Sequence, residues 1–214
     1  MIAEALIAGG IAGFAALAVL AANRLRDRGT AASLSRRVAA VLGGGACLIA
    51  VLTLDAWMAT AISASVALSV LLLRVYWPQQ VRGLSGSGPV RRWGEIAYLL
   101  AATMAIMVGW GVLGDKWLAF LPIAFMAWGD NAAGLVRALG SGGREVDTWA
   151  SAAMLAVCLG AAALYQPYWI GAIGAVAATV AERFRPASHP LWDDNWIIVA
   201  ASLFAMRMLT TSNL

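Results

Sequence analysis

Eight long apolar segments are the feature of this sequence that most restricts how the chain can fold. They cover about residues 2–22, 38–54, 56–76, 95–113, 117–137, 149–165, 167–182 and 195–211. A helix needs about 20 apolar residues to cross a bilayer, and in lipid only helices or closed barrels satisfy the whole backbone. The segments lack the alternation of β-strands. The sequence therefore predicts an all-α integral membrane protein, a polytopic bundle of about eight (seven to nine) transmembrane helices.

The composition agrees with the membrane class and leaves little room for a soluble domain. Hydrophobic residues make up 62% and charged residues 12% of the 214 residues, against about 45–50% and about 25% in soluble domains. We expect one polytopic domain over residues 1–214. We expect no cleavable signal peptide, because the first apolar run carries Glu4 instead of a basic leader. Cys47 and Cys158 lie in apolar segments without CxxC spacing, and we expect both to be buried hydrophobes.

The arginines predict how the chain is oriented. Thirteen of the 15 basic residues lie in or beside four alternate connections: 23–37, 74–94, 138–148 and 183–194. The other connections contain only Asp55, Asp115 and Lys116 as charged residues. The positive-inside rule places the arginine-bearing connections in the cytoplasm and both termini on the other side. We therefore expect a multi-pass protein of a prokaryotic cytoplasmic membrane, with no nucleic-acid partner.

An acidic residue interrupts the fifth apolar segment, in the stretch "AWGDNAAGL", which contains Asp130 and Asn131. An aspartate well inside a span costs roughly 2.5–3.5 kcal/mol on insertion scales, and such groups usually face a polar cavity. The predicted topology moves Asp130 to the cytoplasmic rim. On a helix it shares one face with Gly134 and Arg137. Gly134 would let a ligand approach the backbone beside the carboxylate.

Further acids gather at the same predicted face: Asp27, Glu95, Glu145, Asp147, Glu182, Asp193 and Asp194. We expect Asp27 and Glu145 to form surface ion pairs. The stretch "WDDNW" places Asp193, Asp194 and Asn195 at the start of the last helix, where a cap needs only one acid. Carboxylates without His or Cys nearby suit Mg²⁺, and arginines on the same face suit phosphate oxygens. Together they suggest a nucleotide or pyrophosphate that meets a lipid.

Four blocks of the sequence carry a family resemblance. "AWGDNAAGLVRALG" (127–140) resembles the "GDaaAalvGrrfG" signature of the CTP-dependent polyprenol kinases, the dolichol kinase and phytol kinase family, which is distantly similar to phosphatidate cytidylyltransferases. Three other blocks resemble the family in the same order: "SRRVAAVLGGG" (35–45), "RRWGEIAYLL" (91–100) and "VAERFRPASHPLWDDNWIIVAAS" (180–202). The resemblance covers about residues 35–205. In the segment that corresponds to the family's "KSlEGs", Arg144 and Asp147 replace Lys and Glu, and Ala40 replaces an early His.

The resemblance implies a membrane-embedded lipid kinase. It would transfer the γ-phosphoryl group of a nucleotide, CTP in the family, to an isoprenoid alcohol of the phytol, geranylgeraniol, farnesol or dolichol class at the cytoplasmic face. The expected catalytic residues are Asp130, Asp194 and Glu95, and the expected Mg²⁺ ligands are Asp130, Asp193, Asp194 and Glu182. The expected nucleotide and phosphate contacts are Asn131, Gly134, Arg137, Arg144, Asp147, Arg37 and Asn195. The expected partners are the alcohol, the nucleoside triphosphate and membrane lipids; a homo-oligomer stays open.

Two alternatives remain at this stage. One is a cytidylyltransferase, which would join CMP to a lipid phosphate and release pyrophosphate. The other is a non-enzymatic small transporter with Asp130 and Glu182 as an ion or proton relay, although the charges gather on one predicted face. The loop "GLSGSGP" (83–89) is expected to be a linker, since no Walker P-loop occurs. The only histidine, His189, is expected to be solvated.

Overall fold

The structure, a computed structural model, describes residues 2–85, 93–184 and 193–211. Within these residues the chain is helical and contains no strand. His189 and residues 86–89 of the predicted linker lie outside the described residues, whereas Gly83 and Leu84 of that linker belong to a short 3-10 helix. The described part therefore confirms the predicted all-α class.

Each of the eight predicted apolar segments corresponds to one helix or one continuous series of helical turns. In chain order these are α1 (Ile2–Asp27), α2 (Ala32–Thr53), α3 (Ala56–Tyr76), α4 (Gly94–Ala105) with η3 (Ile106–Val112), α5 (Trp117–Ala124) with η4 (Phe125–Asp130) and α6 (Asn131–Leu139), α7 (Arg144–Ala162), α8 (Tyr168–Arg183) and α9 (Asp194–Thr211). A short 3-10 helix, η1 (Pro78–Leu84), follows α3.

Five of these helical segments are long and apolar enough to cross a membrane. They begin at Ala3, Ala32, Ala56, Gly94 and Trp117 and have 19 to 25 residues each. Helices α7, α8 and α9 have 19, 16 and 18 residues. The structure is thus compatible with a multi-pass α-helical membrane protein. Eight spans and the sidedness of the termini stay predictions.

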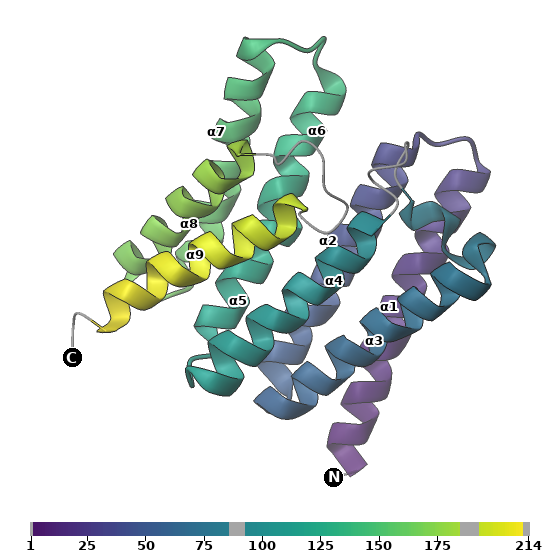
Figure 1. Cartoon of the computed structure of the whole chain (residues 1–214), viewed down its shortest axis with the longest axis horizontal. Helices are drawn as coiled ribbons and strands as arrows, with labels where there is room; N and C mark the ends of the chain where they lie inside the picture. Colours follow the sequence, from purple (N-terminus) through teal and green to yellow (C-terminus); the bar gives the residue numbers. More distant parts are fainter. Residues whose placement is uncertain (1, 86–92, 185–192, 212–214) are drawn as a thin grey trace.

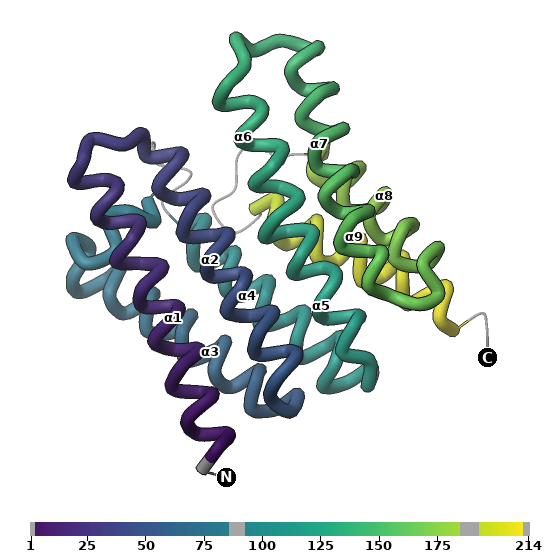
Figure 2. The backbone as a smooth tube through the Cα atoms, turned by 180° about the vertical axis from the view of Figure 1, so that it is seen from behind, coloured from purple at the N-terminus to yellow at the C-terminus, as the bar shows by residue number. Residues whose placement is uncertain are grey.

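The connections alternate between two ends of the bundle (Figure 1). The α1–α2 connection, η1, the α6–α7 connection and the first turn of α9 lie toward one end, at the top of the view. The α2–α3 and α7–α8 connections and the first turn of α1 lie toward the opposite end. Figure 2 shows the same alternation from behind, with α5 between α2 and the α7–α9 group. The described parts of the predicted arginine-bearing connections therefore share one end of the molecule, here called the arginine end.

Two of the acids away from the arginine end have a local structural role. Asp55 Oδ1 accepts hydrogen bonds from the backbone N–H groups of Trp57 and Met58, both at 2.9 Å, at the start of α3. Asp115 Oδ1 accepts one from the N–H of Trp117 at 2.8 Å, at the start of α5. Asp55 is the N-cap of α3, and a cap of this kind contributes about 1 kcal/mol. These hydrogen bonds at the starts of two helices explain why Asp55 and Asp115 occur at these positions.

Small residues bring the helices close together. A Cβ on Gly109 of η3 would lie 2.6 Å from the backbone of α5, and one on Gly174 of α8 would lie 2.7 Å from Met206 of α9. Close backbone approach of this kind is how small residues stabilise membrane helix pairs. Cys47 and Cys158 are both buried, which confirms the prediction made for them.

The segment η1 is fixed to the end of α1 at the arginine end. Asn23 Nδ2 donates to the carbonyl of Gln80 at 2.6 Å, and the Gly83 N–H donates to Asn23 Oδ1 at 2.8 Å. Both oxygens of Asp27 accept hydrogen bonds from Arg82, at 2.6 to 2.9 Å. The predicted surface ion pair of Asp27 is therefore present, and it holds η1 against α1.

Candidate functional site

A cavity of about 450 Å³ extends from the arginine end into the interior of the bundle. Its charged lining consists of Arg36, Arg37, Glu95, Asp130, Arg137, Asp193 and Asp194. Farther in, it is lined by mostly apolar side chains of α1, α2 and α3 and by Leu99 of α4. One cavity therefore joins a charged end to an apolar interior.

The cavity brings together most of the residues that the sequence singled out. Nine of them line it: Asp130, Asp193, Asp194, Glu95, Asn131, Gly134, Arg137, Arg37 and Asn195. These residues come from α2, α4, η4, α6 and the start of α9, so all four family-like blocks meet here. Glu182, Arg144 and Asp147 are not among the lining residues. Arg36, which also lines the cavity, was not predicted, although it adjoins Arg37 in "SRR".

Asp130 is the last residue of a π-helical turn, Phe125–Asp130, inserted between α5 and α6. Gly129 in this turn lies so close to α7 that a Cβ there would be 2.5 Å from the sulfur of Cys158. Single π-helical turns are rare and occur frequently at functional sites. The turn places Asp130 at the cavity and holds it against a neighbouring helix.

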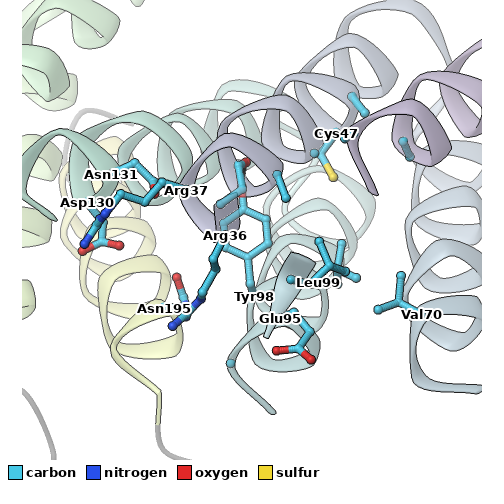
Figure 3. Close-up of a pocket in the computed structure, with 18 of the residues that line it drawn as sticks. Arg36, Arg37, Cys47, Val70, Glu95, Tyr98, Leu99, Asp130, Asn131 and Asn195 are labelled. Atoms are coloured by element: carbon cyan, nitrogen blue, oxygen red, sulfur yellow. Dashed lines mark hydrogen bonds between the residues drawn. The ribbon is translucent and has the colours of Figure 1, made fainter. Parts of the chain in front are cut away.

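Arg37 of α2 reaches across Gly134 toward Asp130 and Asn131 (Figure 3). A Cβ on Gly134 would overlap the guanidinium group of Arg37. The sequence predicted that Gly134 leaves room for a ligand, but the structure shows Arg37 in that room. The carboxylate of Asp130 also interacts electrostatically with Arg36. The missing side chain at residue 134 therefore serves to bring a cation to the carboxylate.

Asp193 connects the start of α9 to Arg36 of α2, beside the start of α4. Its Oδ1 accepts a hydrogen bond from the N–H of Asn195 at 3.2 Å, so Asp193 is the acid that caps α9. Its Oδ2 lies 4.0 Å from Arg36 Nη2. A Cβ on Gly94 would be 2.6 Å from Arg36 Nη2 and 2.9 Å from Asp193 Oδ2, so this contact needs glycine there. Asp194 is then left to line the cavity.

Burial changes the protonation of this acidic pair. Burial and the neighbouring Asp194 carboxylate raise the pKa of the Asp193 carboxyl to about 8, against the lowering effect of Arg36. A buried carboxylate beside a second one favours the neutral form. Burial beside Asp194 therefore favours the protonated form of Asp193 more than water would.

Glu95 is a buried carboxylate on the cavity wall, with 6% of its side chain exposed. Arg74 Nε lies 3.4 Å from its Oε1. Among the described residues, neither Glu95 oxygen accepts a hydrogen bond. The next turn of α4 carries Tyr98, whose hydroxyl donates to the carbonyl of Ala40 at 2.7 Å. Glu95 thus keeps hydrogen-bonding capacity toward the cavity while Tyr98 fixes α4 to α2.

Arg137 and Glu182 form a buried pair beside the cavity. Arg137 Nη1 and Nη2 donate to the two Glu182 oxygens at 2.8 and 3.0 Å, and Arg137 Nε donates to Asp147 Oδ1 at 3.0 Å. The Glu182 side chain is completely buried. This network connects α6, α7 and α8. Arg144 is exposed at the start of α7.

Asp130 and Asp194 are two carboxylates of the cavity wall that could share a cation. Among the described residues, no three Asp, Glu, His or Cys side chains form a group that could hold a metal ion. Asp130 and Asp194 both line the cavity and interact electrostatically. Mg²⁺ is usually held by one or two carboxylates together with water and substrate phosphates, and not by a cage of protein ligands. A divalent cation held by these two carboxylates would need further ligands from water or from a bound molecule.

Comparisons of the chain with protein-family models, curated proteins and solved structures give no match. The fold and the cavity are the features that define what kind of protein this is. It is an α-helical protein, compatible with a multi-pass membrane protein, whose cavity joins a cluster of carboxylates and guanidinium groups to an apolar interior.

Proposed function

We propose that this protein is a membrane lipid kinase, which transfers the γ-phosphoryl group of a nucleoside triphosphate to an isoprenoid alcohol. The observation that carries the proposal is the single cavity with a charged end and an apolar interior. A phosphorylated nucleotide needs the first, and a lipid alcohol needs the second. Their reacting groups would meet where the two parts join.

The charged end supplies what phosphoryl transfer asks of a protein, which is mainly positioning and neutralisation of charge. Asp130 and Asp194 would hold Mg²⁺, and the ion would neutralise charge on the phosphate oxygens. Arg36 and Arg37, both on the cavity wall, would bind phosphate oxygens. Asn131 donates its amide N–H to the Ala127 carbonyl at 2.8 Å, which orients its side-chain oxygen for a further contact.

Glu95 would accept the proton of the alcohol. In the proposed reaction the alcohol oxygen forms a bond to the γ-phosphorus, and the bond from this phosphorus to the β–γ bridging oxygen breaks. The nucleoside diphosphate leaves with its electron pair, and the hydroxyl proton passes to Glu95. General base catalysis requires a carboxylate within hydrogen-bond reach of the hydroxyl. Glu95 is buried, faces the cavity and retains that capacity.

The proposed topology places this chemistry at the cytoplasmic face. All eight apolar segments would span the bilayer, with the arginine end in the cytoplasm as the positive-inside rule requires. Single cysteines replacing Ser141 and Gln166, in exposed connections at opposite ends, test this arrangement. A membrane-impermeant maleimide should label S141C only from the cytoplasmic side and Q166C only from the other. The reverse pattern would contradict the orientation.

Labelled nucleotides separate the proposed reaction from its nearest rival. Purified protein with Mg²⁺ receives CTP, UTP or ATP labelled in the γ-phosphate, together with farnesol, geranylgeraniol, phytol or a long polyprenol. We expect γ-label in a lipid monophosphate, with CTP as the preferred donor by resemblance. Transfer of label from α-labelled CTP to phosphatidate would instead identify a cytidylyltransferase. Absence of both products with every acceptor would contradict an enzymatic role.

A further inference from the structure

The inner part of the cavity is an apolar chamber between α1, α2 and α3. Ile11 and Val19 of α1, Gly43 and Cys47 of α2 and Ile62 of α3 lie on its wall. The chamber is continuous with the end that carries Asp130 and the arginines (Figure 3). A ligand that filled the whole cavity would therefore have a polar head and an apolar tail.

Helices α1 and α3 border this chamber but make few contacts with each other. Helix α1 packs mainly on α2 and η1, and α3 packs mainly on α4. Each helix is therefore held by other neighbours, and the seam between them does not stabilise the bundle much. Side chains at such a seam can move at lower cost than those in a tightly packed interface.

A second, smaller groove lies on the same seam. It has a volume of about 350 Å³ and is lined by Glu4, Ala5, Ala8, Met58, Ala61, Ile62 and Ser65. Ile62 belongs to the wall of both this groove and the main cavity. Its half-buried side chain therefore separates the groove from the chamber.

We propose that the chamber binds the hydrocarbon tail of the lipid alcohol, and that the tail enters from the bilayer between α1 and α3, past Ile62. This inference rests on the proposed function, because the tail belongs to the acceptor of the same reaction. In this arrangement the charged end of the cavity binds the hydroxyl group at Glu95, and the apolar chamber surrounds the hydrocarbon tail. A lipid alcohol has both of these parts. A polar metabolite would gain nothing from the apolar chamber.

The depth of the chamber along α2 would set which tails fit. Gly43 follows Arg37 by six residues, which corresponds to about 9 Å along a helix, and Ala50 follows it by thirteen, or about 20 Å. A Cβ on Gly43 would meet no atom within 4 Å. A larger side chain there would therefore fill the chamber close to the head group, with little cost to packing. Ile62→Trp would instead block entry of the tail through the seam between α1 and α3.

Photolabelling without nucleotide tests the inference separately from catalysis. The full-length protein in lipid nanodiscs binds a farnesol analogue with a diazirine at the end of its tail, and labelled peptides are identified by mass spectrometry. We expect label on α1, α2 and α3 that unlabelled geranylgeraniol suppresses. Helix α7, which contributes no residue to the wall of the cavity, is the internal control.

Two variants and a matched control complete the experiment. Gly43→Leu and Ile62→Trp should each lower labelling at least about ten-fold, which is the size of effect that a misfit of one methylene produces in an apolar pocket. Gly160→Leu makes the same change as the first variant where a Cβ also meets no atom within 4 Å, on α7. Its labelling should match the wild type.

The outcomes separate this inference from the proposed function. Label confined to α7, α8 or α9 would overturn the tail chamber even if phosphoryl transfer occurs. Label on α1 to α3 that Gly43→Leu removes would support the chamber even if no phosphoryl transfer is found, and only the kinase proposal would then fail.

Discussion

The guanidinium group of Arg37 occupies the space that a side chain on Gly134 would fill. These two residues belong to different family-like blocks, and their contact brings Arg37 of α2 to the π-helical turn that ends in Asp130. The cation and the carboxylate at the centre of the site are therefore positioned by the absence of a Cβ on a third element.

Gly134→Ala should weaken nucleotide use more than stability. The added methyl group displaces the end of a flexible side chain, so the fold can adjust, but Arg37 then leaves Asp130. Arg37 is thereby displaced from the position proposed to bind a phosphate oxygen, and loss of one hydrogen bond to a charged group is worth about 1.5–3 kcal/mol, roughly ten- to a hundred-fold in kcat/KM for the nucleotide. Gly45→Ala is the control, because its Cβ would meet only Phe14 at 3.9 Å. Equal kinetics for both variants would argue against this role of Arg37.

Glu95→Gln should slow the chemical step and leave nucleotide binding unchanged. The amide keeps the size of the side chain but cannot accept the alcohol proton, and general base catalysis contributes typically 10²–10⁴-fold. Steady-state kinetics should show the loss in kcat, with an unchanged Kd for the nucleotide. Glu145→Gln, on the exposed start of α7, should keep full activity. A loss confined to KM would assign Glu95 to substrate binding instead.

Arg137→Ala should destabilise the protein strongly. It leaves the completely buried Glu182 without its bidentate partner, and breaking a buried ion pair on one side costs roughly 3–5 kcal/mol. Thermal unfolding in detergent measures the effect. Arg144→Ala removes an exposed arginine at the start of α7 and should leave Tm unchanged. Similar Tm values for the two variants would mean that the network does not hold α6, α7 and α8 together.

The neighbouring acids Asp193 and Asp194 should respond differently to the same substitution. Asp193 caps α9, and asparagine caps helices about as well as aspartate, so Asp193→Asn should keep the wild-type Tm. Asp194→Asn removes a carboxylate that interacts with Asp130, and it should raise the Mg²⁺ concentration needed for half-maximal activity about ten-fold or more. If Asp193→Asn raised the Mg²⁺ requirement more than Asp194→Asn did, Asp193 would be the residue that binds Mg²⁺.

The sequence predicted the helices and the gathering of charge well because both depend on local composition. Hydropathy locates the apolar segments, and arginine placement sorts their connections, so the joint location of Asp130, Glu95 and Asp194 at the arginine end followed. The contacts made by individual arginines and glycines were harder to predict from the sequence. Nothing in α5 predicts a π-helical turn before Asp130, because residues 117–128 are apolar on every side and carry no periodic pattern that an extra residue could shift.

Partner choice among charged side chains was also beyond the sequence. Glu182 was a candidate metal ligand, but the structure pairs it with Arg137, since only tertiary packing decides which of several arginines meets a buried acid. Likewise, Gly134 was expected to admit a ligand, and the crossing of α2 over α6 gives its space to Arg37. These contacts depend on helix crossings that spacing along one helix does not contain.

Transfer of γ-label from CTP to geranylgeraniol, compared between the wild type and Asp130→Asn, tests the central claim most directly. Asp130→Asn keeps the size of the side chain and removes the negative charge proposed to bind the Mg²⁺–nucleotide complex. We predict labelled lipid monophosphate with the wild type, and a loss of at least about a hundred-fold with the variant. Label transfer by the variant at the wild-type rate, or no label in any isoprenoid alcohol with the wild type, would contradict the account.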